Sequence, residues 1–213
     1  MRDPARQLLA PTVGTGVLMA VYLLVRPYGD AGSESETAQA FASTAWLVAH
    51  VCGALALASV GRLGLRLADL TDSVAARVAR SSGLAGAVLV LPYYGAETFA
   101  LHVIGRRALT DPAALALAEE VRTVPVALAT FGIGLVLLMV AGVAIGIAAT
   151  RALALRPGWA AWPLAALTAL FPVQFFVPPA GRMAFGVLYA ASAAVLVLGV
   201  LRASRGGART PSH

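Results

Sequence analysis

The chain has 213 residues, of which 59% are apolar and only 12% are charged. This composition, with a mean hydropathy of +0.81, excludes a soluble globular domain and predicts an all-α integral membrane protein that crosses the bilayer several times. The net charge of +6 does not indicate binding to nucleic acid. Its basic residues, all of them arginines, are spread between apolar stretches rather than gathered together.

The sequence predicts no cofactor and no metal. The single cysteine, Cys52, lies inside an apolar stretch, which excludes an intrachain disulfide and a cysteine-based metal site. A haem held by two histidines is not expected, because His50 and His102 differ by roughly 10 Å in their expected depth in the membrane. No spacing typical of metal ligands or of a phosphate-binding loop occurs in the chain.

Six apolar stretches predict six transmembrane helices, which would form a single transmembrane domain of residues 1–201. They are residues 8–25, 38–60, 81–107, 124–150, 159–177 and 182–201. Internal prolines predict a kink in the third helix, at Pro92, and a bent or broken fifth helix, which contains Pro163 and Pro172. Residues 202–213 are basic and rich in Gly and Ser, so we expect a disordered cytoplasmic tail.

The segment after the second predicted helix is amphipathic. An apolar stripe alternates there with charged residues along 61–80, which predicts a helix that lies at the membrane surface and meets anionic lipid over residues 62–80. Within the same segment, Asp72 or Ser73 is suited to cap a helix that continues into the third crossing.

Two further patterns predict local contacts. Asp111 followed by Pro112 is typical of a helix start and predicts a short surface helix over 113–122. Gly142 and Gly146 have the GxxxG spacing, which favours close helix approach, either inside the protomer or in a homodimer.

The distribution of arginine predicts the orientation of the chain. If both termini are cytoplasmic, 11 of the 16 arginines lie on the inner side, as the positive-inside rule requires. The abundance of Ala, Gly, Val and Leu, with Arg in place of Lys, is typical of GC-rich coding. We therefore expect a location in the plasma membrane of a bacterium.

The third crossing carries the only carboxylate inside any apolar stretch, Glu97. A charged group at the centre of a membrane helix costs roughly 2.5–3.5 kcal/mol on insertion scales, so it needs a partner, water or a proton. Helical spacing places Tyr93 and Tyr94 on the same face as Glu97, and His102 continues a neighbouring row. Three interpretations remain: a packed internal polar cluster, a site for a proton, ion or polar ligand, or a Glu97 that reaches headgroup level.

Most polar side chains of the predicted helices fall in the outer half of the membrane. At about 1.5 Å per residue, His50 and Glu97 lie at comparable depths, and Gln174 lies nearer the outer surface. Because consecutive helices usually neighbour one another, we expect Glu97 to meet His50. The candidate site comprises Glu97, His50, Tyr93, Tyr94, His102 and Gln174, in a cleft that opens outward.

Two functions fit these patterns. The first is a small permease or proton-linked carrier with Glu97 as the titrating group. The second is a structural or partner-binding membrane subunit whose polar cluster only fixes helix packing. The short loops favour both over an enzyme with a folded catalytic domain.

Overall fold

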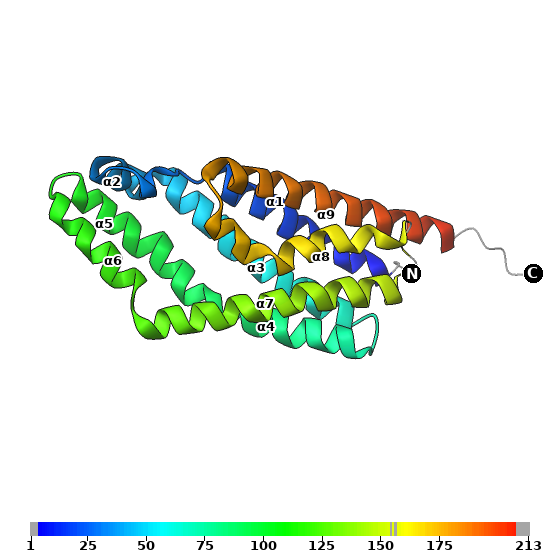
Figure 1. Cartoon of the computed structure of the whole chain (residues 1–213). Coiled ribbons are helices and arrows are strands. Elements are labelled where there is room, and N and C mark those ends of the chain that lie inside the picture. The colour runs from blue at the N-terminus through cyan, green and yellow to red at the C-terminus, as the bar shows by residue number, and fades with distance from the viewer. Residues whose placement is uncertain (1–3, 154, 156, 208–213) are drawn as a thin grey trace, which may run out of the picture.

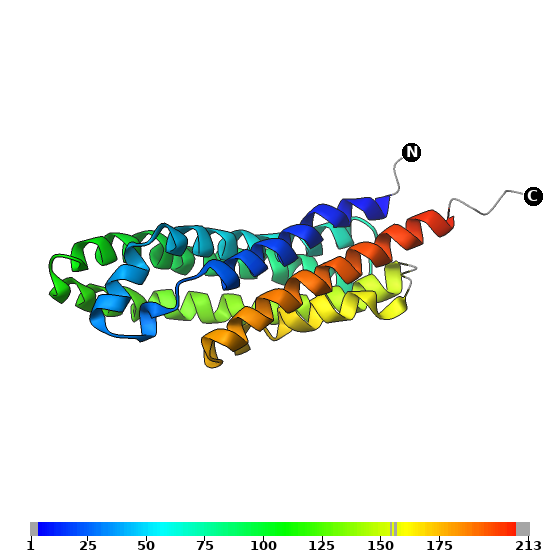
Figure 2. The same cartoon turned by 90° about the horizontal axis from the view of Figure 1, so that it is seen from above.

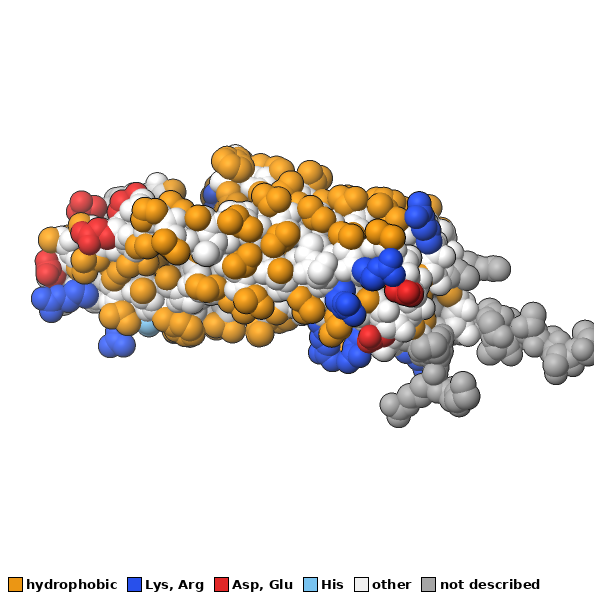
Figure 3. Space-filling view, turned by 90° about the horizontal axis from the view of Figure 1, so that it is seen from below, with side chains coloured by type: hydrophobic (Ala, Val, Ile, Leu, Met, Phe, Trp, Pro, Cys, Tyr) orange, Lys and Arg blue, Asp and Glu red, His pale blue; other side chains and the backbone are white. Residues whose placement is uncertain are grey.

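The computed structural model describes residues 4–153, 155 and 157–207, and these residues form helices joined by turns, with no strand among them (Figure 1). Within this described part, five helical runs are long and apolar enough to cross a membrane. They are Ala5–Val25, Thr44–Ala68, Val74–Ala108, Pro125–Ala152 and Pro179–Ser204. Figure 3 shows a broad apolar band on the surface between two ends that carry charged side chains. Together these features are those of a membrane protein.

The long helices pack as a closed ring. α1 (Leu9–Val25) contacts α3 (Thr44–Ala68) and α9 (Pro179–Gly207), as Figures 1 and 2 show. α4 (Val74–Gly95) contacts α3 and α7 (Pro125–Ala152), and α8 (Trp162–Ala169) lies between α7 and α9. One apolar core fills the ring, with Met19, Leu57, Leu138 and Tyr189 among its fully buried side chains.

A small cap covers the end of the bundle opposite the two termini (Figure 1). It consists of η2 (Gly29–Ala31), α2 (Glu34–Ala42), α5 (Leu101–Ala108), η4 (Pro112–Leu115) and α6 (Ala116–Arg122). The 35-residue run Val74–Ala108 is about 50 Å long, whereas the hydrocarbon core of a bilayer is about 30 Å thick, so one end of it must project. Its α5 end lies in the cap and packs there around Phe41, Trp46 and Leu101.

The second and sixth predicted crossings have different boundaries in the structure. The helix predicted over 38–60 is divided at Ser43, whose hydroxyl accepts a hydrogen bond from the backbone N–H of Trp46 and caps α3. At the other end of the chain, α9 continues to Gly207. The last helix is therefore longer than the predicted crossing 182–201. Disorder of the tail stays a prediction, and residues 208–213 lie outside the described residues.

The predicted fifth crossing, 159–177, is not one continuous helix. Its prolines predicted a bent or broken helix, and the structure has the broken form. The segment forms η5 (Gly158–Ala161), the two-turn helix α8, and η6 (Phe171–Phe176). Pro172 is the second residue of η6. At about 1.5 Å per residue, the eight residues of α8 cover only about 12 Å. The segment is therefore broken, and it is not among the five helical runs that are long and apolar enough to cross a membrane by themselves.

The surface helix predicted over 61–80 is also wrong. α3 runs on to Ala68, and α4 starts at Val74 after a turn. Leu63 and Leu67 point into the core instead of toward lipid, being 2% and 1% exposed. The predicted cap at Ser73 is confirmed, because its hydroxyl accepts a hydrogen bond from the backbone N–H of Ala76 at 3.2 Å. Contact of this hairpin with anionic lipid stays a prediction.

Gly142 and Gly146 serve packing inside the chain. A Cβ at Gly142 would lie 2.7 Å from the backbone nitrogen of Ala169, and one at Gly146 would lie 3.0 Å from the Cβ of Ala165, both on α8. Since α8 covers this surface, a homodimer through these two glycines would need α8 to move away. Close approach inside the protomer was one of the two predicted outcomes.

Candidate functional site

A cavity of about 270 Å³ lies at the cap end of the ring, and we call it the charged cavity. Its lining comes from both the ring helices and the cap, and from the broken segment η6. The residues are Tyr22, Arg26, Asp30, His50, Tyr93, Tyr94, Glu97, Arg122, Phe131, Phe175 and Arg182. Four of the six predicted site residues, His50, Tyr93, Tyr94 and Glu97, therefore share one cavity.

Glu97 lies on a local irregularity of its helix. Ala96–Ala100 form a single π-helical turn, η3, in which the N–H of Leu101 bonds the carbonyl of Ala96. Such turns insert a residue into an α-helix and are frequent at functional sites. The irregularity follows one turn after Pro92, which cannot donate a backbone hydrogen bond. The indole N–H of Trp46 donates to the carbonyl of Glu97 at 2.6 Å and ties this turn to α3.

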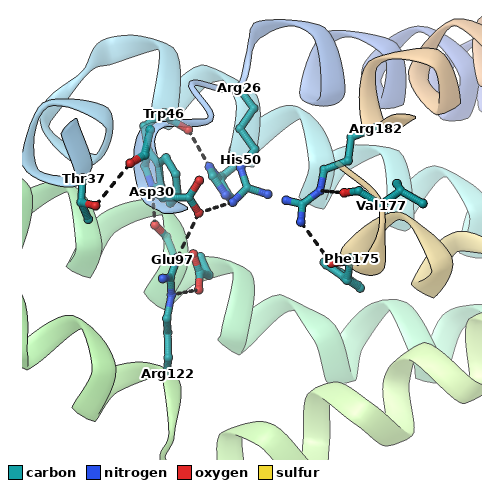
Figure 4. Close-up of polar contacts among 11 residues, drawn as sticks. Arg26, Asp30, Thr37, Trp46, His50, Glu97, Arg122, Phe175, Val177 and Arg182 are labelled. Atoms are coloured by element: carbon teal, nitrogen blue, oxygen red, sulfur yellow. Dashed lines mark hydrogen bonds and ion pairs between the residues drawn. The ribbon is translucent and has the colours of Figure 1, made fainter. Parts of the chain in front are cut away.

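The carboxylate of Glu97 is paired with Arg122 rather than with His50. The Nε and Nη2 atoms of Arg122 donate to the two carboxylate oxygens at 2.7 and 3.0 Å (Figure 4). The Glu97 side chain is only 14% exposed and that of Arg122 25%. A two-bond arginine–carboxylate pair is the strong form of this contact. Tyr93 and Tyr94, which helical spacing places on the same face, make no hydrogen bond to this carboxylate among the described contacts.

A second carboxylate extends the ion pairs across the cap. Asp30 of η2 accepts from Arg26 at 2.5 Å and lies 3.7 Å from Arg122. Burial alone lowers the pKa of the Arg122 guanidinium, but its bonds with Glu97 and the charge of Asp30 raise that pKa above the ordinary value. The pKa of Arg26 is likewise raised, because the groups around it outweigh the effect of burial. Both arginines therefore stay cationic at every physiological pH.

Arg182 approaches the cavity from the opposite side, in the first turn of α9 (Figure 4). Its Nε and Nη2 atoms donate to the carbonyls of Val177 and Phe175, both at 3.1 Å. These carbonyls belong to the end of the broken segment, where helical hydrogen bonding stops. Within the described structure Arg182 has no carboxylate partner.

His50 is held by its own helix. Its Nδ1 atom lies 2.8 Å from the carbonyl of Trp46, which can only accept, so Nδ1 carries the proton. In the neutral ring the other nitrogen, Nε2, is then an acceptor. The ring packs against Trp46 and Tyr22, with centroid distances of 4.0 and 5.5 Å. His50 thus lines the cavity as an oriented imidazole.

The two tyrosines contribute mainly their rings to the cavity. Tyr93 stacks on Phe131 with a centroid distance of 4.4 Å, and Phe131 in turn meets Phe175 of η6 at 6.0 Å. Tyr94 is 3% exposed, and its hydroxyl lacks a hydrogen-bond partner in the described part of the chain. One side of the charged cavity is consequently aromatic.

The other two predicted site residues lie outside the cavity lining. His102 sits in α5, where its Nδ1 lies 2.9 Å from the carbonyl of Phe41 and links α5 to α2. Gln174 is fully buried in η6, beside the lining residue Phe175. Neither amide atom of Gln174 has a hydrogen-bond partner among the residues described. The structure thus separates both side chains from the cluster around Glu97.

Sequence reasoning missed the four charged residues Arg26, Asp30, Arg122 and Arg182. It placed Arg26, Asp30 and Arg122 in outer loops and Arg182 at the outer end of the sixth crossing, where a charge needs no partner. A signal was present, since each of the three arginines lies at or within two residues of the end of an apolar stretch, on the side that the positive-inside rule disfavours. In the described residues, no group of three or more His, Cys, Asp and Glu side chains is placed to hold a metal ion.

Comparison with known proteins gives no match: no family model fits the sequence, and neither a curated protein nor a solved structure is detectably similar to it.

Proposed function

We propose that the chain is a small membrane carrier that binds a polar solute in the charged cavity. The observation that carries this proposal is the gathering of five charged side chains, from four separate parts of the chain, around one cavity in an otherwise apolar bundle. Ionisable groups inside membrane bundles are costly, and in transport proteins they mark the solute pathway.

The broken segment supports the same function. Phe175 of η6 forms part of the cavity wall, and Arg182 bonds the carbonyls at the end of η6. Interrupted helices whose free backbone groups face a site are a common feature of carriers. A movement of α8 and η6 would change access to the charged cavity without disturbing the five long helical runs.

For the topology we propose six crossings, with the broken segment α8–η6 as the fifth and both termini in the cytoplasm. The two ends of the chain lie at the same end of the bundle (Figure 1), as an even number of crossings requires. The arginine distribution then favours cytoplasmic termini in a bacterial plasma membrane. With this orientation, the cap and the charged cavity face the outside.

Glu97 is compatible with a proton-linked cycle. A proton on its carboxylate would weaken both bonds from Arg122, and Asp30, 3.7 Å away, is the second partner toward which Arg122 could shift. Protonation would thus rearrange the cavity instead of leaving a buried charge without a partner.

Transport by purified protein in proteoliposomes tests the proposal. Filter assays would measure the uptake of radiolabelled small acids, amines and neutral polar compounds, with and without an imposed pH gradient. We expect uptake of one chemical class, and its loss in Glu97→Gln. Arg106→Ala is the control, because Arg106 is exposed in α5 and does not line the cavity.

The second candidate function, a structural or partner-binding subunit, is favoured by one observation. The ion pairs from Arg26 through Asp30 and Arg122 to Glu97 join the end of α1, the cap and η3. Such a network would hold the cap in place even without a ligand. A correctly folded protein that takes up no compound of the panel, with or without a pH gradient, would support this subunit and contradict the carrier.

A further inference from the structure

The charged cavity contains more cations than anions. Three guanidinium groups, of Arg26, Arg122 and Arg182, face two carboxylates, of Asp30 and Glu97. Both carboxylates are bound by arginine, and Arg122 engages both of them. Among the described residues, the charge of Arg182 is therefore left without an anionic partner. In a partly enclosed space of low dielectric, an unpaired cation attracts an anion strongly.

Arg26 and Arg182 come together at one aromatic ring. The guanidinium carbons of Arg26 and Arg182 lie 5.6 and 5.9 Å from the ring centroid of Tyr28. The Tyr28 hydroxyl donates to the carbonyl of Leu23 at 2.6 Å, which fixes the ring. Figure 4 shows the two guanidinium groups pointing toward one another across the cavity. Like charges repel, so this arrangement gains from an anion between them.

Arg26 and Arg182 differ in how their guanidinium groups are bound. Arg26 is only 8% exposed, and its buried Nε atom has no hydrogen-bond partner within the described chain. Arg182 is bound only through Nε and Nη2, to neutral carbonyls. A carboxylate accepts up to about four hydrogen bonds and matches the planar fork of arginine. A carboxylate would therefore suit Arg182, which lines the cavity and bonds only neutral carbonyls in the described structure.

The rest of the cavity defines the other end of the ligand. Tyr94, Phe131 and Phe175 present aromatic rings to it. Its volume of about 270 Å³ equals that of about nine water molecules in the liquid. The single excess positive charge matches a ligand with one negative charge. A short acid with an apolar or aromatic body fits the aromatic lining, the volume and the excess positive charge of the cavity.

We propose that the charged cavity binds a small monocarboxylic acid with an aromatic or apolar body, its carboxylate held between Arg26 and Arg182. This assignment names the solute class of the carrier function and rests on that proposal for its biological role. The binding itself does not require transport.

Binding of benzoate to the purified full-length protein tests the assignment. Isothermal titration calorimetry would compare benzoate with benzamide and benzylamine, which have the same ring with a neutral or a positive group. We expect benzoate to bind, benzamide to bind at least about tenfold more weakly, and benzylamine not to bind. Arg182→Ala should weaken benzoate binding by about 10- to 100-fold, the usual range for loss of a charged hydrogen-bond partner.

Two further variants separate binding from folding. Arg182→Gln keeps an amide donor for the η6 carbonyls but removes the charge, so it should fold with an unchanged thermal midpoint and still lose benzoate. Arg106→Ala removes the same charge outside the cavity and should bind benzoate normally. Equal affinity for benzoate and benzamide, or full benzoate affinity in folded Arg182→Gln, would overturn the assignment.

The two proposals fail in different ways. If benzoate binds but no compound of the panel is taken up, the carrier function is wrong and the ligand class stands. If amines or neutral compounds are taken up while benzoate does not bind, the carrier function stands and the ligand class is wrong.

Discussion

Arg122→Ala should destabilise the protein far more than Glu97→Gln does. Without Arg122, the nearly buried carboxylate of Glu97 loses the one cation that hydrogen-bonds to it in the described structure, and breaking a buried pair in this way costs about 3–5 kcal/mol. Without the charge of Glu97, Arg122 still has Asp30 at 3.7 Å. A loss of about 3 kcal/mol corresponds to a midpoint about 6–12 °C lower in a chain of this size. Thermal unfolding followed by size-exclusion chromatography would measure it.

The double variant Arg122→Ala/Glu97→Gln should recover part of this loss, because no unpaired charge remains. Arg107→Ala is the matched control. Its partner Asp111 lies 3.5 Å away, and the two side chains are 70% and 47% exposed, so removing the pair should cost less than about 1 kcal/mol. Similar midpoints for Arg122→Ala and Arg107→Ala would show that the ion pairs of the cavity do not hold the cap.

Gly64→Leu should prevent the ring from assembling. α3 and α4 are so close at this point that a Cβ on Gly64 would lie 2.4 Å from the carbonyl oxygen of Ala79, a backbone atom that cannot rotate away. Even Gly64→Ala should cost about 1–3 kcal/mol through overpacking. We expect Gly64→Leu to give no monodisperse peak in fluorescence-detected chromatography.

Gly132→Leu is the control for this prediction. Gly132 lies inside α7, where a Cβ would meet no atom within 4 Å, and Gly132→Ala should even gain up to about 1 kcal/mol of helix propensity. Both variants at this position should therefore keep the wild-type peak. A normal peak for Gly64→Leu would contradict the close packing of α3 on α4.

The sequence predicted the long helices well because the length of an apolar stretch is a local property. α1 and α7 begin and end within two residues of the predicted boundaries. The prediction of a surface helix over 61–80 failed for a related reason. The apolar stripe that contains Leu63 and Leu67 is as typical of a buried helix face as of a lipid-facing one. Only the turn between Ala68 and Ser73 shows that α3 ends and a new helix begins in this segment.

For the site, the sequence identified Glu97 but not its partner. An isolated carboxylate in an apolar helix is recognisable without any structure, because its burial has a cost. Arg122 lies 25 residues further along the chain, in a cap helix. The contact between Arg122 and Glu97 forms only because the cap folds over the end of the ring. That tertiary contact has no counterpart in helical periodicity, so His50, on the preceding helix, was the nearest partner that the pattern offered.

Thiol labelling tests most directly whether the charged cavity is a solute site open to the outside. In a Cys52→Ser background, Phe131→Cys places a thiol in the cavity, and Leu138→Cys places one on the same helix in the core, where Leu138 is 1% exposed. Intact cells would be treated with the membrane-impermeant anionic reagent 2-sulfonatoethyl methanethiosulfonate. We predict labelling of Phe131→Cys and none of Leu138→Cys. Labelling of Phe131→Cys only after permeabilisation would contradict the orientation, and no labelling of the folded variant from either side would contradict the solute site itself.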